Sequence, residues 1–250
     1  MLLSAALLGI ALALLSWSTR RSQRQYALFK TYTETRDRQR FYRRWLVGGL
    51  MEFGAGTIVA LALLGRLRAM IRMPPAFEAI GQSLRIAAPL REAMHGGAIL
   101  GFGAGALIGV AALTVVSAVR RRQAKTVMLG DVQALLPRNG AETGLCALLS
   151  INAGVGEELF FRLLLPLLIA NVTGGDAGFG FLVAGAVFGL AHVYQGWVGI
   201  VATMIVGFLF TALYLWSGQL WIAMAAHGGL DLVGLVIRPS IARALARRTG

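Results

Sequence analysis

The sequence predicts an all-α fold, a polytopic transmembrane helix bundle of about seven spans, and three observations support this fold class. Hydrophobic residues make up 57% of the 250 residues, and the mean hydropathy is +0.69. Charged residues make up only 14%, against about 25% in a typical soluble domain. The apolar residues form long segments, and a helix needs roughly 20 of them to cross a bilayer core of about 30 Å. Because lipid offers backbone groups no hydrogen-bond partner, we expect these segments to be helical.

Seven apolar segments are candidates for the spans, and links of only a few residues separate the last four, which predicts antiparallel neighbours. The segments are Leu2–Trp17, Trp45–Leu64 (carrying Glu52), Met94–Val119, Gly144–Asn171, Gly178–Tyr194, Trp197–Trp216 and Gln219–Ile237. On this division, residues 1–143 form an N-terminal membrane region with basic loops, residues 144–237 a helical core, and residues 238–250 a basic tail. The chain has one cysteine, Cys146, so no intrachain disulfide is expected.

The net charge of +13 is distributed in a way that predicts orientation. Strong basicity can indicate nucleic-acid binding. Here, however, the basic residues gather between apolar segments, as they do in loops that face an anionic cytoplasmic leaflet. We therefore expect membrane lipid as a partner and no nucleic acid. With seven spans, residues 18–44, residues 120–141 and the C-terminus are cytoplasmic, whereas residues 65–92 fall outside, where 74–92 could form an interfacial helix. The excess of Arg over Lys is typical of a GC-rich bacterial genome, which predicts a bacterial inner-membrane location.

Ionisable residues inside apolar segments are costly, so each one is a candidate for function. Most of them follow residue 150: Glu157, Glu158, Arg162, His192, His227 and Asp231. Glu158 and Arg162 are four residues apart and share a helix face, so they can neutralise each other. Glu157 points about 100° away from that face. These residues alone leave open whether Glu157 is catalytic or is an interfacial carboxylate beside a structural ion pair.

The two histidines lie in patterns that also allow two interpretations. His192 follows Phe188 by four residues, and it is either a base partner or ligand, or a packing residue near a span end. His227 and Asp231 are four apart and can touch, so Asp231 could fix the imidazole tautomer, both could face a substrate, or both could form a polar helix contact. The sequence has no His-Glu-x-x-His zinc motif and no Gly-x-Ser-x-Gly elbow.

Taken in order, the three motifs resemble the CPBP family of intramembrane proteases, which includes CAAX prenyl proteases and bacteriocin-processing enzymes. The resemblance rests on Glu157-Glu158-x-x-x-Arg162, Phe188-x-x-x-His192 and His227-x-x-x-Asp231, and it covers roughly residues 144–237. It implies that Glu157 is the general base that activates a water and that His192 holds this water. It also implies that His227 stabilises the oxyanion with help from residue 231, and that Glu158 and Arg162 hold the site together.

The resemblance implies a glutamate-type protease that requires no cofactor and no metal, although Glu157, His192 and His227 could in principle hold zinc. The family pattern often has Asn at position 231. An ionised Asp cannot donate a hydrogen bond to an oxyanion, so Asp231 is either protonated or acts only by orienting His227.

The function expected from these patterns is intramembrane endopeptidase activity on membrane-associated or lipidated peptides or proteins. Two alternatives stay open: a non-catalytic scaffold or immunity protein of the same family, and a proton-coupled transporter that uses Glu and His as a relay. A transporter usually contains inverted repeats, which the sequence does not show.

The depth of Glu157 leads to a further expectation about its helix. A straight helix from Gly144 puts Glu157 about 20 Å along the axis, whereas His192 lies at the cytoplasmic end of its own span. We therefore expect an interruption at Gly154-Val-Gly156, with Glu157 and Glu158 in the first turn of a new helix, where the helix dipole favours acids. The interruption would let Glu157, His192 and His227 meet in the cytoplasmic half of the membrane.

Overall fold

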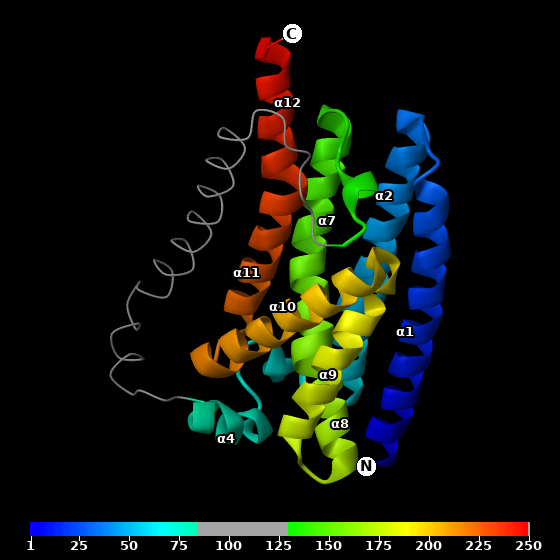
Figure 1. Cartoon of the computed structure of the whole chain (residues 1–250). Helices are drawn as coiled ribbons and strands as arrows, with labels where there is room; N and C mark the ends of the chain where they lie inside the picture. The colour runs from blue at the N-terminus through cyan, green and yellow to red at the C-terminus, as the bar shows by residue number, and fades with distance from the viewer. Residues whose placement is uncertain (85–129, 250) are drawn as a thin grey trace, which may run out of the picture.

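The computed structural model describes residues 1–84 and 130–249, and every regular element in these residues is helical (Figure 1). The N-terminal region begins with α1 (Leu2–Phe29). A second long run follows, made of α2 (Thr35–Gly49), a π-helical turn η1 (Leu50–Ala55) and α3 (Gly56–Leu63). The region ends with a short 3-10 turn η2 (Leu67–Met70) and with α4 (Pro75–Leu84). The predicted span Met94–Val119 lies outside the described residues.

The second part of the chain contains a long helical run, a helix that forms a hairpin with it, and two further helical runs. After the 3-10 turn η3 (Gln133–Leu135), the run consists of α7 (Gly140–Glu158), the π-helical turn η4 (Leu159–Leu164) and α8 (Leu165–Thr173). It is followed by α9 (Ala177–Ala191), the 3-10 turn η5 (Val193–Gln195) and α10 (Gly196–Ser217). The chain ends in α11 (Leu220–Leu232), the π-helical turn η6 (Val233–Ile237) and α12 (Arg238–Thr249).

Four helical runs of the described residues are long and apolar enough to cross a membrane: Leu2–Phe29, Thr35–Leu63, Val193–Ser217 and Leu220–Ala244. A shorter apolar helix, Ala177–Ala191, lies among them. The predicted all-helical membrane fold is thus confirmed for the residues described, whereas four candidate runs do not establish the predicted count of seven.

The predicted interruption near residues 154–156 is wrong. The α7 helix runs through Gly154 and Gly156 to Glu158, and the chain continues directly into η4. Asn139 caps the start of this helix, where its side chain accepts a hydrogen bond from the Glu142 backbone N–H at 3.0 Å. Glu157 therefore lies near the end of α7, not in the first turn of a new helix.

The tight turn between α8 and α9 explains why no interruption is needed. Gly174 and Gly175 have φ values of +85° and +110°, a region that favours glycine. Glu157 lies 18 residues before Gly175, and His192 lies 17 residues after it. Because both arms of a helical hairpin rise by about 1.5 Å per residue, these two residues reach the same level. The sequence-based estimate placed Glu157 too far from His192 because it counted the depth of each residue from a different membrane face. Counting from the shared α8–α9 turn brings the two residues to the same level.

The described parts of the basic regions predicted to lie on one side include segments that meet at one end of the bundle. Figure 1 shows the α1–α2 connection, the start of α7 and the C-terminus at this end, and the N-terminus and the α8–α9 turn at the other. Arg138 donates hydrogen bonds to the carbonyl oxygens of Tyr32 and Thr33 at 3.3 Å. Arg243 donates to the Thr143 hydroxyl at 2.9 Å. A cytoplasmic location of this end stays a prediction.

A buried ion pair fastens α2 to α7 at the same end. Arg38 Nε donates to Glu142 Oε2 at 3.1 Å, and both side chains are almost completely buried. The guanidinium also donates to the carbonyl oxygens of Ala134 and Leu136 at 3.0 Å and to the Tyr42 hydroxyl at 2.9 Å. This network satisfies charges that would be costly to bury unpaired, and it joins the N-terminal region to the start of the α7 helix.

The α7 and α11 helices pack backbone to backbone at Gly154. A Cβ atom at this position would lie 2.6 Å from the Gly228 backbone nitrogen and 2.8 Å from the Met224 carbonyl oxygen. Neither backbone atom can move aside alone, so a larger residue at 154 must separate the two helices. This contact brings α7 and α11, which carry Glu157 and His227, close together.

We therefore expect Gly154→Ala to destabilise the fold by about 1–3 kcal/mol, the usual range for overpacking a filled core. The measurement is the midpoint of thermal unfolding in detergent. Gly144→Ala is the matched control, because a Cβ there meets nothing within 4 Å and alanine has the higher helix propensity. Equal unfolding midpoints for Gly154→Ala and the wild type would contradict the close packing.

Candidate active site

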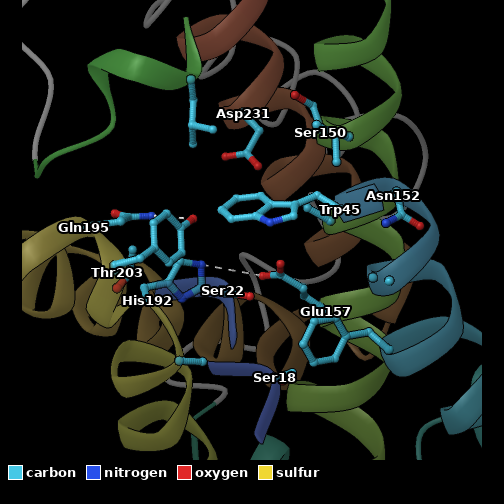
Figure 2. Close-up of a pocket in the computed structure, with 18 of the residues that line it drawn as sticks. Ser18, Ser22, Trp45, Ser150, Asn152, Glu157, His192, Gln195, Thr203 and Asp231 are labelled. Atoms are coloured by element: carbon cyan, nitrogen blue, oxygen red, sulfur yellow. Dashed lines mark hydrogen bonds and ion pairs between the residues drawn. The ribbon is translucent and has the colours of Figure 1, made fainter. Parts of the chain in front are cut away.

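Three of the predicted site residues converge where the ends of α7 and α9 meet α11. Glu157 Oε2 lies 3.9 Å from His192 Nε2 and 4.0 Å from His227 Nε2. Figure 2 shows the Glu157 and His192 side chains pointing toward each other. A direct hydrogen bond spans about 2.6–3.2 Å, so these separations are too long for one and suit a single bridging water. Within the described structure, buried Glu157 Oε2 has no hydrogen-bond partner, which leaves it free to bind that water.

A backbone hydrogen bond fixes the orientation of His192. This residue caps the C-terminus of α9, and its Nδ1 lies 2.8 Å from the Phe188 carbonyl oxygen. A carbonyl oxygen only accepts, so Nδ1 carries a proton, and Nε2 is the ring nitrogen that faces Glu157. The Phe188 ring packs against the imidazole at a centroid distance of 4.7 Å. The spacing of four residues thus supplies both the acceptor and the packing surface for His192.

Glu158 holds His227 from the opposite side of the imidazole. His227 Nδ1 donates to Glu158 Oε1 at 2.8 Å, and the ring stacks on Phe210 at 5.0 Å. Its Nε2 faces Glu157 and lies 3.8 Å from Asp231 Oδ2. The sequence pattern left open whether Asp231 fixes the tautomer of His227. In the structure, His227 Nδ1 donates to Glu158. Asp231 instead lies near Nε2 of His227, and 33% of its side chain is exposed.

The predicted pairing of Glu158 with Arg162 is present. Arg162 Nη1 lies 3.0 Å from Glu158 Oε1, and the side chains are 1% and 0% exposed. The guanidinium also donates to the Gly207 carbonyl oxygen at 3.1 Å and lies 4.2 Å from the Phe188 ring centroid. Arg162 therefore neutralises the carboxylate that orients His227, and it ties η4 to α10.

A cavity of about 870 Å³ opens onto these groups and is lined in part by Glu157, His192, His227 and Asp231. The N-terminal helices supply much of the remaining wall, with these residues: Ser18, Ser22 and Gln25 of α1, Trp45 of α2, and Glu52 of η1. Figure 2 shows the Trp45 indole among the side chains that line the cavity together with Asp231, Glu157 and His192. No sequence motif pointed to these wall residues, although Glu52, like Glu157, is a carboxylate inside an apolar segment.

The fold and the site together define a class: a helical membrane protein with an enclosed centre of one glutamate and two histidines. Residues 139–233 match the family model described as type II CAAX prenyl endopeptidase Rce1-like, a family of intramembrane proteases. The match confirms the family resemblance, and the matched segment contains every residue of the three motifs. The chain therefore carries a domain of the membrane-protease kind. The match covers less than half of the chain and excludes α1 to α4. No curated protein and no solved structure matches the chain.

Proposed function

We propose that the protein is an intramembrane endopeptidase that hydrolyses peptide bonds of membrane-associated or lipidated peptides or proteins. The observation that carries the proposal is the position of Glu157 Oε2, about equally far from the two histidine Nε2 atoms at 3.9 and 4.0 Å. Peptide hydrolysis needs a base, a water and a group that stabilises the developing oxyanion. The proposed location is the bacterial inner membrane, with the C-terminus in the cytoplasm.

In this mechanism Glu157 and His192 hold the water between them. Glu157 Oε2 takes a proton from the water as its oxygen attacks the carbonyl carbon of the scissile bond. The carbonyl π electrons move to oxygen, and His227 in its imidazolium form donates Nε2–H to that oxyanion. Collapse of the intermediate breaks the C–N bond, and Glu157 passes its proton to the leaving nitrogen. Glu158 accepts from His227 Nδ1 throughout, so the imidazole keeps its orientation.

Asp231 has a different position from the other two acids of the site. Its carboxyl lies 3.8 Å from the nitrogen that contacts the oxyanion and borders the cavity. We propose that Asp231, as the protonated acid, donates a second hydrogen bond to the oxyanion; as the carboxylate, it would stabilise the His227 imidazolium. The first role acts directly on the oxyanion, and the second acts through His227.

Comparative peptidomics of membranes tests the proposal. Cells that produce the wild-type protein or Glu157→Ala at equal levels are compared for peptide termini that require the wild type. We expect a set of new termini close to predicted membrane-spanning or lipidated segments. An unchanged set of termini, together with an unchanged cellular role of Glu157→Ala, would instead support the scaffold or immunity function. Proton-coupled flux without cleavage would support the transporter.

We expect no tightly bound metal in the purified protein. The expectation follows from the resemblance to proteases that require no metal, and not from the donor atoms, because Glu157, His192 and His227 could in principle hold zinc through the Oε2 and Nε2 atoms that face one another. Metal analysis should show zinc well below one equivalent, and chelators should leave peptide hydrolysis unchanged. Stoichiometric zinc, with activity lost to a chelator and restored by zinc, would overturn this expectation.

A further inference from the structure

The η1 turn places a third acid of the cavity wall, Glu52, near Glu157, in addition to Asp231. The α7 helix contacts η1 at Gly156, where a Cβ atom would lie 3.2 Å from Phe53 Cβ and 3.5 Å from the Gly54 nitrogen. Glu52 adjoins this contact on η1 and Glu157 adjoins it on α7, and both residues line the same cavity. Glu52 comes from the N-terminal region, which lies outside the segment that matches the protease family.

Glu52 lies in one of the π-helical turns that border the cavity. The described residues contain three π-helical turns: η1, η4 and η6. Each contributes to the cavity wall, through Glu52 in η1, Phe161 in η4 and Leu235 in η6. Such turns are rare and occur frequently at functional sites. All three π-helical turns of the described residues thus border this cavity; η4 contains the motif residue Arg162, and η6 begins two residues after Asp231.

Glu52 differs from the structural carboxylates in its partners. Glu142 and Glu158 are each paired with a buried arginine. Glu52 Oε1 lies 2.6 Å from the Ser18 hydroxyl, and no Lys, Arg or His nitrogen of the described residues lies within 4.0 Å of its carboxyl group. Glu52 is partly exposed, and Arg21, which lines the same cavity, acts on it electrostatically without forming an ion pair within 4.0 Å. A ligand that brings a positive charge into contact with the carboxyl group therefore gains a direct ion pair that the described residues do not make.

We propose that Glu52 is a specificity residue that binds a cationic group of the substrate, a Lys or Arg side chain of a peptide whose scissile bond lies at Glu157. The proposal rests on the proposed function. On this proposal, the N-terminal helices select the substrate, and the segment from α7 to α11 cleaves it. Ser18 is then a positioning residue, because its hydroxyl holds the carboxyl group of Glu52 toward the cavity.

A matched set of peptides tests this assignment. Palmitoylated peptides with a fluorophore and a quencher carry Lys at one position in turn, and an otherwise identical set carries norleucine, which has a similar length and no charge. We expect at least one position at which Glu52→Gln lowers kcat/KM for the Lys peptide by about 10-fold or more, the scale of a desolvated charge pair. The norleucine peptide should be cleaved equally by both proteins, and Glu52→Lys should favour a Glu peptide.

The control is Glu34→Gln, a change at an exposed acid at the start of the same helical run, which should leave all the rates unchanged. Equal loss on Lys and norleucine peptides would show a structural role and overturn the proposal. If the wild type cleaves no peptide, the proposed function fails separately. Fluorescence anisotropy then measures binding of the same peptides to Glu157→Gln, with and without Glu52→Gln. A Lys preference that requires Glu52 supports the subsite, and equal binding of both sets rejects it.

Discussion

Glu157→Gln is expected to lower peptide hydrolysis by at least about 10²–10⁴-fold, the usual contribution of a general base. The amide has nearly the same shape as the carboxylate but does not accept a proton from water at neutral pH. Folding should be little affected, because Glu157 Oε2 has no hydrogen-bond partner to lose within the described residues. The measurement is the single-turnover rate on a substrate found by peptidomics, together with the unfolding midpoint in detergent.

Glu34→Gln serves as the control for this substitution as well, since it removes one exposed carboxylate far from the motifs. It should retain the full rate. Wild-type turnover by Glu157→Gln would remove Glu157 from the role of base. A loss of rate accompanied by a large fall in the unfolding midpoint would assign Glu157 a structural role.

The second large effect is expected at Arg162. Arg162→Ala leaves the Glu158 carboxylate buried without its arginine partner, and breaking a buried pair in this way costs about 3–5 kcal/mol. Glu158 is also the acceptor for His227 Nδ1, at 2.8 Å, so the orientation of that imidazole should be lost with it. We expect a much lower unfolding midpoint in detergent and little hydrolytic activity in the protein that still folds.

A double-mutant cycle separates charge from packing at this pair. Adding Glu158→Gln to Arg162→Ala removes the unpaired charge, so the double variant should be more stable than Arg162→Ala alone. Arg40→Ala breaks an exposed ion pair with Asp37 and is the control, with an expected cost of about 0–1 kcal/mol. Additive effects of Arg162→Ala and Glu158→Gln would show that the two side chains do not interact energetically.

The features that could be predicted from the sequence depend on short-range spacing. Glu158 and Arg162 share a helix face because they are four residues apart, and the structure places them 3.0 Å apart. The same spacing places His192 on the face of Phe188, and in the structure its Nδ1 lies 2.8 Å from the Phe188 carbonyl oxygen. The motif order also indicated that Glu157 and both histidines converge, although the reasoning about depth required a break in α7 that the structure does not contain.

The features that could not be predicted join residues far apart in the chain. The Glu158–His227 hydrogen bond spans 69 residues, and the Arg38–Glu142 pair spans 104. Helical periodicity says which face a residue occupies but not which other helix packs there. Glu52 went unassigned for the same reason: its place beside Glu157 depends on the close packing of η1 on Gly156.

The equal arms of the α8–α9 hairpin limit how the length of this segment can vary. One residue inserted between Glu157 and the turn would rotate Glu157 by about 100° and shift it by about 1.5 Å relative to His192. The carboxylate would then face a neighbouring helix and not the imidazole, whatever the identity of the inserted residue. Extra residues between Thr173 and Ala177 would instead lengthen the loop and leave both arms in register. Insertions and deletions should therefore be tolerated between Thr173 and Ala177, and they should be excluded between Glu157 and Thr173 and between Ala177 and His192.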